Sequence, residues 1–345
     1  MRYPFRLVYD SAKHLAARKL HGHRKFALVL TLDPLGGGSS CGRLSADVAA
    51  TNGNSLVEAR PMLSVEQCLD ALAQCDAPIV RIRGGEPLEY PEIGGLSREI
   101  LGRGKHLFLC TDGTLIRRRL HMIPPVTSFF WNVKLDGTQA VHDRLAGREG
   151  LFAEALDGIK SAKNAGFYVV VTTTIYPDTD VKDVAALYSQ LHSEHVDGYS
   201  MTPASRVKKV CQKKSAEFHE QMRKRFAELS ETLGGYNLIN SPIYLEYLRG
   251  ERELDCCTWG SPIYGPQGWA APCSVLKQGH EGSYRELLEN TIWENYGRGM
   301  NPDCETCMCE SGYETAAIIG SNAKAGDTWK MLAWQFRGNL GEKRT

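Results

Sequence analysis

The sequence has no uninterrupted apolar run of the ~18 residues that a membrane-spanning helix needs, so it predicts no transmembrane segment. Charge of one sign is not in excess either: 41 Lys and Arg stand against 40 Asp and Glu, and no global field favours nucleic acid as a partner. No motif repeats at a fixed period, which argues against a solenoid. The N-terminus lacks the regions of a secretory signal, and we therefore expect a cytoplasmic protein.

Cysteine, by contrast, is abundant, with 11 residues in the chain. Without a secretory signal, and in a chain of 345 residues, they indicate reduced thiols and a thiolate-bound metal site better than a disulfide framework. Five are scattered through the first two thirds of the chain and six crowd into the last quarter. The two sets are Cys41, Cys68, Cys75, Cys110 and Cys211, and Cys256, Cys257, Cys273, Cys304, Cys307 and Cys309.

The N-terminal segment, residues 1–24, mixes Leu and Ala with Lys, Arg and His at roughly helical spacing. We expect a surface helix packed beneath a larger core. The alternative is a basic amphipathic face that makes a peripheral contact with a membrane surface.

Six apolar runs, rich in β-branched and aromatic residues, alternate with helical patterns over residues 25–238. Parallel βα units of this kind wind right-handed into a barrel or an open sheet, which places the protein in the α/β class. The predicted strands cover residues 26–35, 77–85, 105–113, 128–137, 167–176 and 198–205. We expect a boundary near residues 236–242, followed by a Cys-rich extension over residues 239–345.

Polar residues follow the predicted strands where each one ends. Ligand-binding residues of parallel βα folds belong at these C-terminal strand ends, so we expect one shared site there. The residues at the six ends are Asp33, Gly84 to Pro87, Cys110 to Gly113, Asp136 with Gly137, Thr172 to Thr174, and Thr202 with Pro203.

The segment GGEP, residues 84–87, follows the second predicted strand. Gly84 and Gly85 let the backbone pass close to a ligand, because no Cβ atoms stand in the way. Glu86, or the backbone around it, can accept hydrogen bonds from a ligand ammonium group. Taken alone, the segment also fits an ordinary turn with an acidic residue.

On the second strand of such an array, GGEP closely resembles the methionine-binding motif of the radical S-adenosylmethionine (SAM) superfamily. The resemblance extends from about Arg6 to Ala317. In detail, the sequence is similar to the hopanoid-biosynthesis branch, the adenosylhopene synthases. The segments that carry it are, in chain order, LDPL, LSVEQCLDAL, GGEPLEYPEI, LCTDG, KLDG with HDR, TTTIY and CTWGSPIYGPQGWAAPC.

The resemblance implies a partial (βα)6 barrel that holds a [4Fe–4S] cluster and SAM. It also implies cleavage of SAM to a 5′-deoxyadenosyl radical, which adds to the double bond of a triterpene, diploptene, and forms a carbon–carbon bond. The expected partners are this apolar polycyclic small molecule and a reductant such as a flavodoxin or ferredoxin. The cofactor-binding residues it implies are Gly84, Gly85, Glu86 and Pro87 at the methionine end, and Thr111, Asp136 and Thr173 at the adenosyl side.

The loop after the first strand departs from the family pattern. The family places CxxxCxxC there, because three thiolates leave one iron open for SAM. In TLDPLGGGSSCGR, residues 31–43, only Cys41 matches, as the third cysteine. One thiolate does not hold such a cluster firmly, so we expect this chain to be inactive in radical chemistry unless a ligand comes from elsewhere. Either a flexible linker has replaced the loop, or the chain is a natural relative that has lost SAM cleavage.

Cys110 is the candidate catalytic residue. A buried cysteine at a strand end is commonly just a small hydrophobe. Addition of a carbon radical to an alkene, however, leaves another carbon radical that needs a hydrogen atom. A thiol S–H bond is weaker than an aliphatic C–H bond, and we therefore interpret Cys110 as a hydrogen-atom donor.

The C-terminal cysteines form a second constellation. Cys257 and Cys273 are spaced C-x10-G-x4-C, and Cys304 and Cys307 form a CxxC pair just before Cys309. The spacing resembles the auxiliary-cluster region of radical SAM enzymes with SPASM or Twitch extensions, which implies a second Fe–S cluster. A zinc site of four thiolates fits the same spacing, and scattered reduced thiols are the third alternative.

Two rival functions remain open at this level. One is a non-catalytic relative that binds SAM or a lipid, which predicts no cluster absorbance after anaerobic reconstitution even with a restored loop. The other is a radical SAM enzyme acting on another alkene or on a peptide, which predicts a cluster but no product with diploptene.

Overall fold

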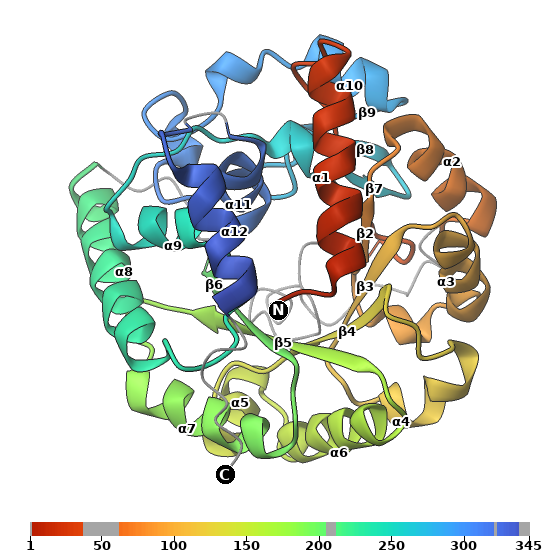
Figure 1. The fold of residues 1–345 in the computed structure, drawn as a ribbon, viewed down its shortest axis with the longest axis vertical. Coiled ribbons are helices and arrows are strands. Elements are labelled where there is room, and N and C mark those ends of the chain that lie inside the picture. The colour runs from red at the N-terminus through yellow and green to blue at the C-terminus, as the bar shows by residue number, and fades with distance from the viewer. Residues whose placement is uncertain (1, 37–61, 205–211, 321–322, 338–345) are drawn as a thin grey trace, which may run out of the picture.

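The computed structural model describes residues 2–36, 62–204, 212–320 and 323–337. Within this part of the chain the sheet has nine strands, in the order β6-β5-β4-β3-β2-β1-β7-β8-β9. Neighbours from β1 to β6 are parallel (Figure 1). The strands are β1 Val29–Leu32, β2 Ile79–Ile82, β3 His106–Thr111, β4 Phe129–Lys134, β5 Tyr168–Ile175, β6 Gly198–Pro203, β7 Ile263–Gly265, β8 Gly268–Ala271 and β9 Gly279–Glu281.

Helices follow the parallel strands in the order that the sequence predicts. The helices α2 to α7 lie on the outer side of the curved sheet, while α1 and α12 lie across one end of it (Figure 1). The helices are α1 Phe5–Leu20, α2 Val65–Cys75, α3 Ile93–Gly102, α4 Ile116–Arg119, α5 Gln139–Ala146, α6 Leu151–Asn164, α7 Val181–Ser193, α8 Gln212–Thr232, α9 Pro242–Arg249, α10 Tyr284–Asn290, α11 Glu310–Ile319 and α12 Asp327–Arg337.

Local sequence signals explain where several helices begin and end. Ser64 caps α2 by accepting a hydrogen bond from the Gln67 N–H at 3.2 Å, and the Gln67 side chain returns one from the Ser64 N–H at 2.8 Å. Ser241 caps α9, which has Pro242 in its first turn and ends at Gly250 in the left-handed conformation. These caps fix the helices that cover the sheet.

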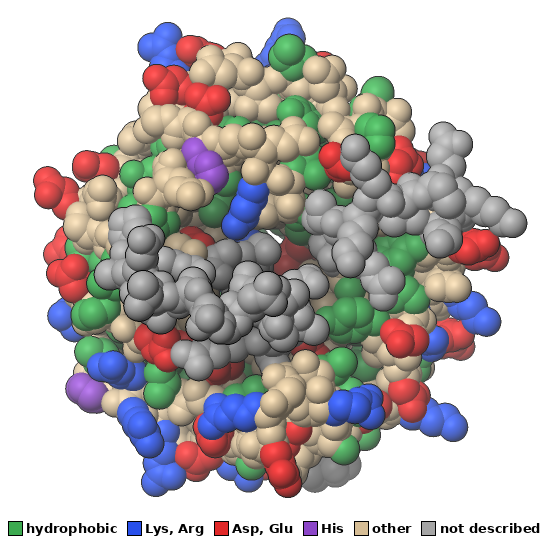
Figure 2. Space-filling view, turned by 180° about the vertical axis from the view of Figure 1, so that it is seen from behind, with side chains coloured by type: hydrophobic (Ala, Val, Ile, Leu, Met, Phe, Trp, Pro, Cys, Tyr) green, Lys and Arg blue, Asp and Glu red, His purple; other side chains and the backbone are tan. Residues whose placement is uncertain are grey.

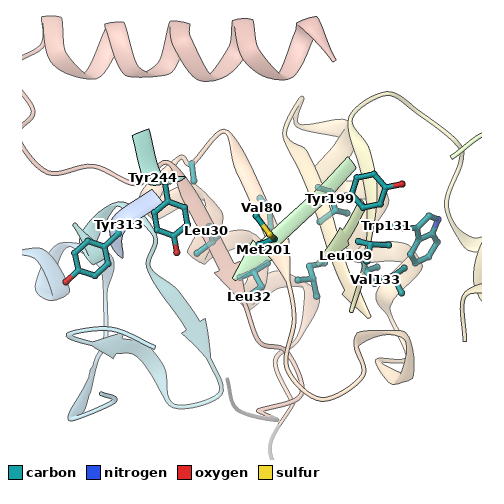
Figure 3. Close-up of a cluster of buried hydrophobic side chains, with 14 of the residues drawn as sticks. Leu30, Leu32, Val80, Leu109, Trp131, Val133, Tyr199, Met201, Tyr244 and Tyr313 are labelled. Atoms are coloured by element: carbon teal, nitrogen blue, oxygen red, sulfur yellow. The ribbon is translucent and has the colours of Figure 1, made fainter. Parts of the chain in front are cut away.

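The strands separate two sets of side chains, because successive residues of a strand point to opposite faces. The outward set packs under the helices and forms the main core. Figure 3 shows part of it, together with Tyr244 of α9 and Tyr313 of α11. Its labelled strand members are Leu30, Leu32, Val80, Leu109, Trp131, Val133, Tyr199 and Met201.

The inward set faces a lumen and changes character along the strands. At the N-terminal end it is apolar: Phe108 and Phe130 stack with ring centroids 4.4 Å apart and pack with Val170 against Leu7 of α1. Toward the C-terminal ends it becomes polar, with Lys134 and Thr174 among its members. The lumen therefore has an apolar end under α1 and a polar end at the opposite face.

The region after residue 239 extends the barrel sheet. β7 pairs parallel with β1, and the hairpin strands β8 and β9 follow it in antiparallel order. Tyr244 of α9 donates to the Met308 carbonyl at 2.8 Å and so fixes the cysteine-rich segment to the helix. The predicted α/β class, with a partial (βα)6 barrel and a C-terminal extension, is confirmed. The boundary near residues 236–242 stays a prediction. No helix among the described residues combines the length and apolarity that crossing a bilayer requires.

Candidate functional site

The GGEP turn lies at the C-terminal end of β2 with an unusual backbone. Gly84 and Gly85 have φ values of +103° and +59°, which are conformations that favour glycine. A Cβ atom on Gly84 would lie 1.8 Å from Oδ1 of Asp33, the residue that follows β1. The turn therefore brings the ends of β1 and β2 into direct contact, and it needs glycine at position 84 to do so.

Glu86 links the ends of β2 and β3. Its carboxylate accepts hydrogen bonds from the Leu88 N–H at 3.0 Å, the Thr111 hydroxyl at 2.8 Å and the Asp112 N–H at 2.9 Å. Burial, and then the Asp112 charge, raise the pKa of Glu86 to about 8. Glu86 thus acts here as a buried brace, with Pro87 as the first residue of a 3-10 turn beside it. Thr111 donates to Glu86 from the face of β3 opposite to that of Cys110. The side chains of Thr111 and Glu86 therefore do not open directly into the lumen.

Asp136 makes the corresponding link between β4 and β5. Its carboxylate accepts the Thr174 N–H at 2.8 Å and lies 3.2 Å from the Lys134 ammonium. The Asp136 N–H donates to Nδ1 of His142 at 3.1 Å, which sets that nitrogen as the unprotonated one. Burial lowers the pKa of His142, while the nearby Asp136 and Asp112 carboxylates oppose the shift. The acidic groups after β3 and β4 therefore gather around one edge.

This edge lies on the face opposite α1 and α12. Figure 2 shows acidic side chains within a hollow near the middle of that face. Gly84, Gly85, Glu86, Thr111 and Asp136, which sequence reasoning chose, all lie at the C-terminal ends of neighbouring parallel strands. The structure thus brings them together at one edge of the barrel.

Thr173 does not face this site. Its hydroxyl donates to the Leu135 carbonyl at 2.8 Å, and the side chain is fully buried on the α7 side, near the Tyr188 hydroxyl. The neighbours Thr172 and Thr174 point the other way, because side chains alternate along β5. The choice of Thr173 for the adenosyl side is therefore corrected in favour of its two neighbours.

Cys110 belongs to the lumen face of β3. The Asn132 amide donates to its Sγ at 3.5 Å and in turn accepts the Thr172 hydroxyl at 2.7 Å. The Arg81 guanidinium interacts electrostatically with Cys110 and is paired with Glu310 of α11 at 2.7 Å. A short polar chain thus holds the thiol in the middle of the lumen. Sequence reasoning missed Asn132 and Arg81, although both lie one strand away on inward positions.

Below these polar side chains lies a cavity of about 430 Å³. It runs from the middle of the barrel, at Arg81, Asn132 and Thr172, to α1 and α12 at the N-terminal end. Its strand walls are mostly apolar and include Val29, Ile79, Phe108 and Val170, with Ile239 and Ile243 closing one side. This volume lies in the range of small-molecule sites.

The structure brings most cysteines of the second constellation together. Cys273, Cys304 and Cys307 surround a small hollow of about 20 Å³, together with Cys256 and Cys309. Burial, and then the neighbouring cysteines, raise the pKa of the Cys256 and Cys307 thiols. The five thiols are thus close enough to influence one another.

Cys257 is corrected by this geometry. It does not line the hollow, and its N–H donates to the Gly312 carbonyl at 3.1 Å while the residue lies in the main core. Its neighbour Cys256 takes the place that the C-x10-G-x4-C spacing assigned to Cys257. Among the described residues, no group of three or more Cys, His, Asp or Glu side chains is arranged to hold a metal ion.

The loop after β1 carries the candidate ligand of the primary cluster. Cys41 lies outside the described residues. Of the described cysteines nearest to it in the chain, Cys68 and Cys75 are buried in the core on α2, where burial raises the pKa of each thiol to about 12. The residues present therefore do not fit a three-thiolate cluster after β1, because Cys41 is the single cysteine between residues 1 and 67.

Comparison with known families gives two matches. Residues 50–191 match the radical SAM superfamily, and residues 197–331 match a domain of unknown function, DUF3463. The first match begins after β1 and Cys41 and covers β2 to β5 with the GGEP turn. The second match covers the cysteine-rich extension, and the description of that domain names no activity.

Individual relatives agree with the first match. An AdoMet-dependent heme synthase from Methanosarcina barkeri is 30% identical over 248 residues, which are 66% of this chain and 71% of that protein. The antilisterial bacteriocin subtilosin biosynthesis protein AlbA from Bacillus subtilis is 23% identical over 299 residues, which are 80% of this chain and 65% of that protein.

A solved structure shows the same fold. The crystal structure of Streptococcus suis SuiB bound to precursor peptide SuiA superposes with a TM-score of 0.61 and 13% identity, over 87% of this chain and 75% of SuiB. At this identity the likeness concerns the arrangement of helices and strands.

Proposed function

Because this chain belongs to the radical SAM superfamily, we propose that its barrel binds SAM at the C-terminal edge and an uncharged, apolar polycyclic alkene in the lumen. The reaction that fits this pair is addition of an adenosyl radical to the alkene, as in the adenosylhopene synthases. In the family, SAM and a [4Fe–4S] cluster supply the radical. The observation that carries the proposal is the cavity of about 430 Å³, whose wall includes Asn132, the residue that contacts the Cys110 sulfur.

The charges of the cavity wall favour an uncharged ligand. Arg81 is paired with Glu310 at 2.7 Å, and Arg252 is paired with Asp327 at 2.6 Å. Burial raises the pKa of Glu314 to about 8, so this group is mostly neutral at pH 7. In the depth of the cavity a charged ligand would have to break one of these buried pairs, whereas an apolar polycycle leaves them intact. Lys19, the other cation of the wall, is exposed at the α1 end.

SAM would lie above the ligand, where the polar strand ends gather. Gly85 would present bare backbone to its methionine end, and Gly84 would let the Asp33 carboxylate approach the turn. Asp33 and Asp112 would supply negative charge for the ammonium group. Glu86 would act through the loops that it braces. Thr172 and Thr174 would face the adenosyl side.

In a version whose cluster loop is restored, Cys110 would complete the reaction. A carbon radical left on the substrate would take the hydrogen atom of the thiol, so that a C–H bond forms, the S–H bond breaks and a thiyl radical remains. The reductant, a flavodoxin or ferredoxin, would then return the thiyl radical to the thiol with one electron and a proton. Asn132 would orient the sulfur through its 3.5 Å contact.

The loop after β1 bears on the activity of this particular chain. With Cys41 as its single cysteine, the segment does not supply the thiolates that a cluster needs. We therefore expect the chain as it stands to bind its ligands without cleaving SAM. The same lack of cluster cysteines favours the alternative function, a natural relative that binds SAM or a lipid without catalysing a reaction.

The C-terminal cysteines would hold a second Fe–S cluster, which their resemblance to auxiliary-cluster regions implies. Five cysteines line one small hollow of about 20 Å³, so their thiols gather at one place. A zinc site of four thiolates fits the same thiols and is the alternative. Iron, acid-labile sulfide and zinc content separates the two.

The test of the proposed reaction uses a version in which residues 36–41 are replaced by a CxxxCxxC segment. After anaerobic reconstitution with iron and sulfide, it is incubated with SAM, reductant and diploptene. We expect an adenosylated triterpene in the mass spectrum. Formation of 5′-deoxyadenosine without any adduct would contradict the substrate.

A further inference from the structure

The outer surface of α1 carries an apolar stripe. Phe5, Tyr9 and Leu20 are 63%, 55% and 86% exposed, and Ala12 and Ala16 between them are exposed as well. These positions follow the spacing that places helical residues on one face. A folded protein rarely leaves such a row in water without use.

α12 carries a matching stripe. Trp329, Leu332 and Phe336 are 76%, 42% and 55% exposed and are spaced by three and four residues, so they share one face of this helix. Gln335, three residues after Leu332, lies beside this stripe and is buried against the segment before α1. The stripe is therefore a second exposed apolar row at the same end of the barrel.

The two helices form one surface. Gln335 of α12 accepts the Arg2 N–H at its carbonyl at 3.1 Å, and its side chain donates to the Tyr3 carbonyl at 2.8 Å. Trp334 packs edge-to-face on Tyr3, with ring centroids 6.2 Å apart. Figure 1 shows α1 and α12 side by side across the end of the barrel. We call the exposed stripes of both helices the α1/α12 face.

The large cavity opens at this face. Its wall includes Ala12 and Leu15 of α1 and Thr328 and Leu332 of α12. Ala12, Thr328 and Leu332 are also exposed to solvent, so the cavity reaches the surface between the two helices. The opening lies at the N-terminal end of the strands, opposite the edge where SAM would bind.

Basic side chains accompany the apolar stripes. Arg6, Lys13, Lys19 and Arg24 are exposed on or just after α1. The single acidic residue of this helix, Asp10, is half-buried and accepts a hydrogen bond from His106 at 2.9 Å. Apolar side chains with flanking cations are the surface that suits an anionic lipid bilayer, whose headgroups attract the cations while the aromatic rings enter the interface.

We propose that the α1/α12 face docks on an anionic lipid bilayer and admits the apolar substrate from the lipid into the lumen. The substrate class rests on the proposed function, whereas the docking does not. The arrangement separates the two ligands: the apolar molecule enters from the membrane side, and the water-soluble SAM enters from the opposite edge. A polycycle insoluble in water never has to cross the aqueous phase on this route.

The experiment is co-sedimentation of the full chain with vesicles of phosphatidylcholine, with and without phosphatidylglycerol. We expect binding to the anionic vesicles that weakens as salt is added. The double variants Phe5→Ser with Tyr9→Ser, and Trp329→Ser with Phe336→Ser, should each lower the affinity about tenfold or more. The control variant Leu145→Ser with Met300→Ser removes exposed apolar side chains, 38% and 70% exposed, from other elements and should bind like the unaltered chain.

Fluorescence of the unaltered chain gives a second readout that needs no variant. Brominated lipids should quench its tryptophan emission, because Trp329 would enter the interface. No binding to either vesicle, or equal losses in the stripe and control variants, would overturn the proposal. A dimer that the stripe variants dissociate, without vesicle binding, would assign the face to a second copy instead. If the cluster-restored version converts diploptene in detergent but the chain ignores vesicles, the docking fails and the proposed function stands.

Discussion

Oδ1 of Asp33 lies 1.8 Å from the point that a Cβ atom on Gly84 would occupy. The first two strand ends of the barrel therefore touch through a side chain on one and bare backbone on the other. This contact fixes the GGEP turn against β1, the strand whose following loop would carry the cluster cysteines in the family.

Gly84→Ala should destabilise the protein by about 2 kcal/mol or more, because the methyl group collides with the carboxylate and φ of +103° strains any other residue. Gly85→Ala is the matched control, since its Cβ would meet no atom closer than 4.0 Å and only the left-handed backbone is penalised, by about 1 kcal/mol. Thermal melting measures both. Equal effects of the two substitutions would refute the contact.

Cys110→Ala, made in the cluster-restored version, should still consume SAM but give little saturated adduct, because the hydrogen-atom donor is gone. In D₂O the version with Cys110 should place one deuterium in the product, since the thiol exchanges with solvent. Asn132→Leu, which removes the 3.5 Å contact to sulfur, should lower the yield less than Cys110→Ala. A normal yield of saturated adduct from Cys110→Ala would remove Cys110 from the mechanism.

Cys256→Ala should lose the iron of the C-terminal hollow, whereas Cys257→Ala should keep it, because only the first of these adjacent residues lines the hollow. Iron, acid-labile sulfide and zinc are measured on anaerobically reconstituted protein. Zinc without sulfide would show a single-ion site. Iron loss from Cys257→Ala but not from Cys256→Ala would contradict the geometry.

Stability should fall as pH rises from about 5 to about 8. Burial raises the pKa of Glu314 to about 8 in the folded protein, above its ordinary value, so the folded state holds a proton that the unfolded state releases. The stability that protonated Glu314 contributes is fully present below the ordinary pKa of a glutamate and is lost as the pH approaches 8. Glu314→Gln should flatten the fall in melting temperature, while Glu66→Gln, at an exposed position of α2, should leave it unchanged. A profile that Glu314→Gln does not alter would contradict the burial argument.

Alternating apolar runs and turn residues predict the parallel barrel well, because strand and helix periods are local properties. The strand ends carry Asp33, GGEP and Asp136, and parallel strands bring such ends to one edge whatever their exact lengths. The same reasoning fails at single-residue precision. Thr173 and its two neighbours are chemically identical in sequence, and only the register of β5 decides which of them face the lumen.

Two further features depend on contacts that no local pattern encodes. Cys256 and Cys257 are adjacent, so spacing alone cannot tell which of them faces the hollow. The large cavity joins α1 near the start of the chain to α12 near its end, and its apolar wall looks like ordinary core when each strand is read by itself. The role of Glu86 is hidden in the same way. In the sequence it resembles a ligand-binding residue, but its carboxylate accepts hydrogen bonds from Leu88, Thr111 and Asp112.

The most direct test of a radical SAM barrel with an incomplete cluster loop is 5′-deoxyadenosine formation after anaerobic reconstitution with SAM and dithionite. The unaltered chain is compared with the version that carries CxxxCxxC in place of residues 36–41. We predict the nucleoside from the restored version and none above background from the unaltered chain. Equal formation by both would show that ligands come from elsewhere, and none from an iron-loaded restored version would contradict SAM binding at this edge.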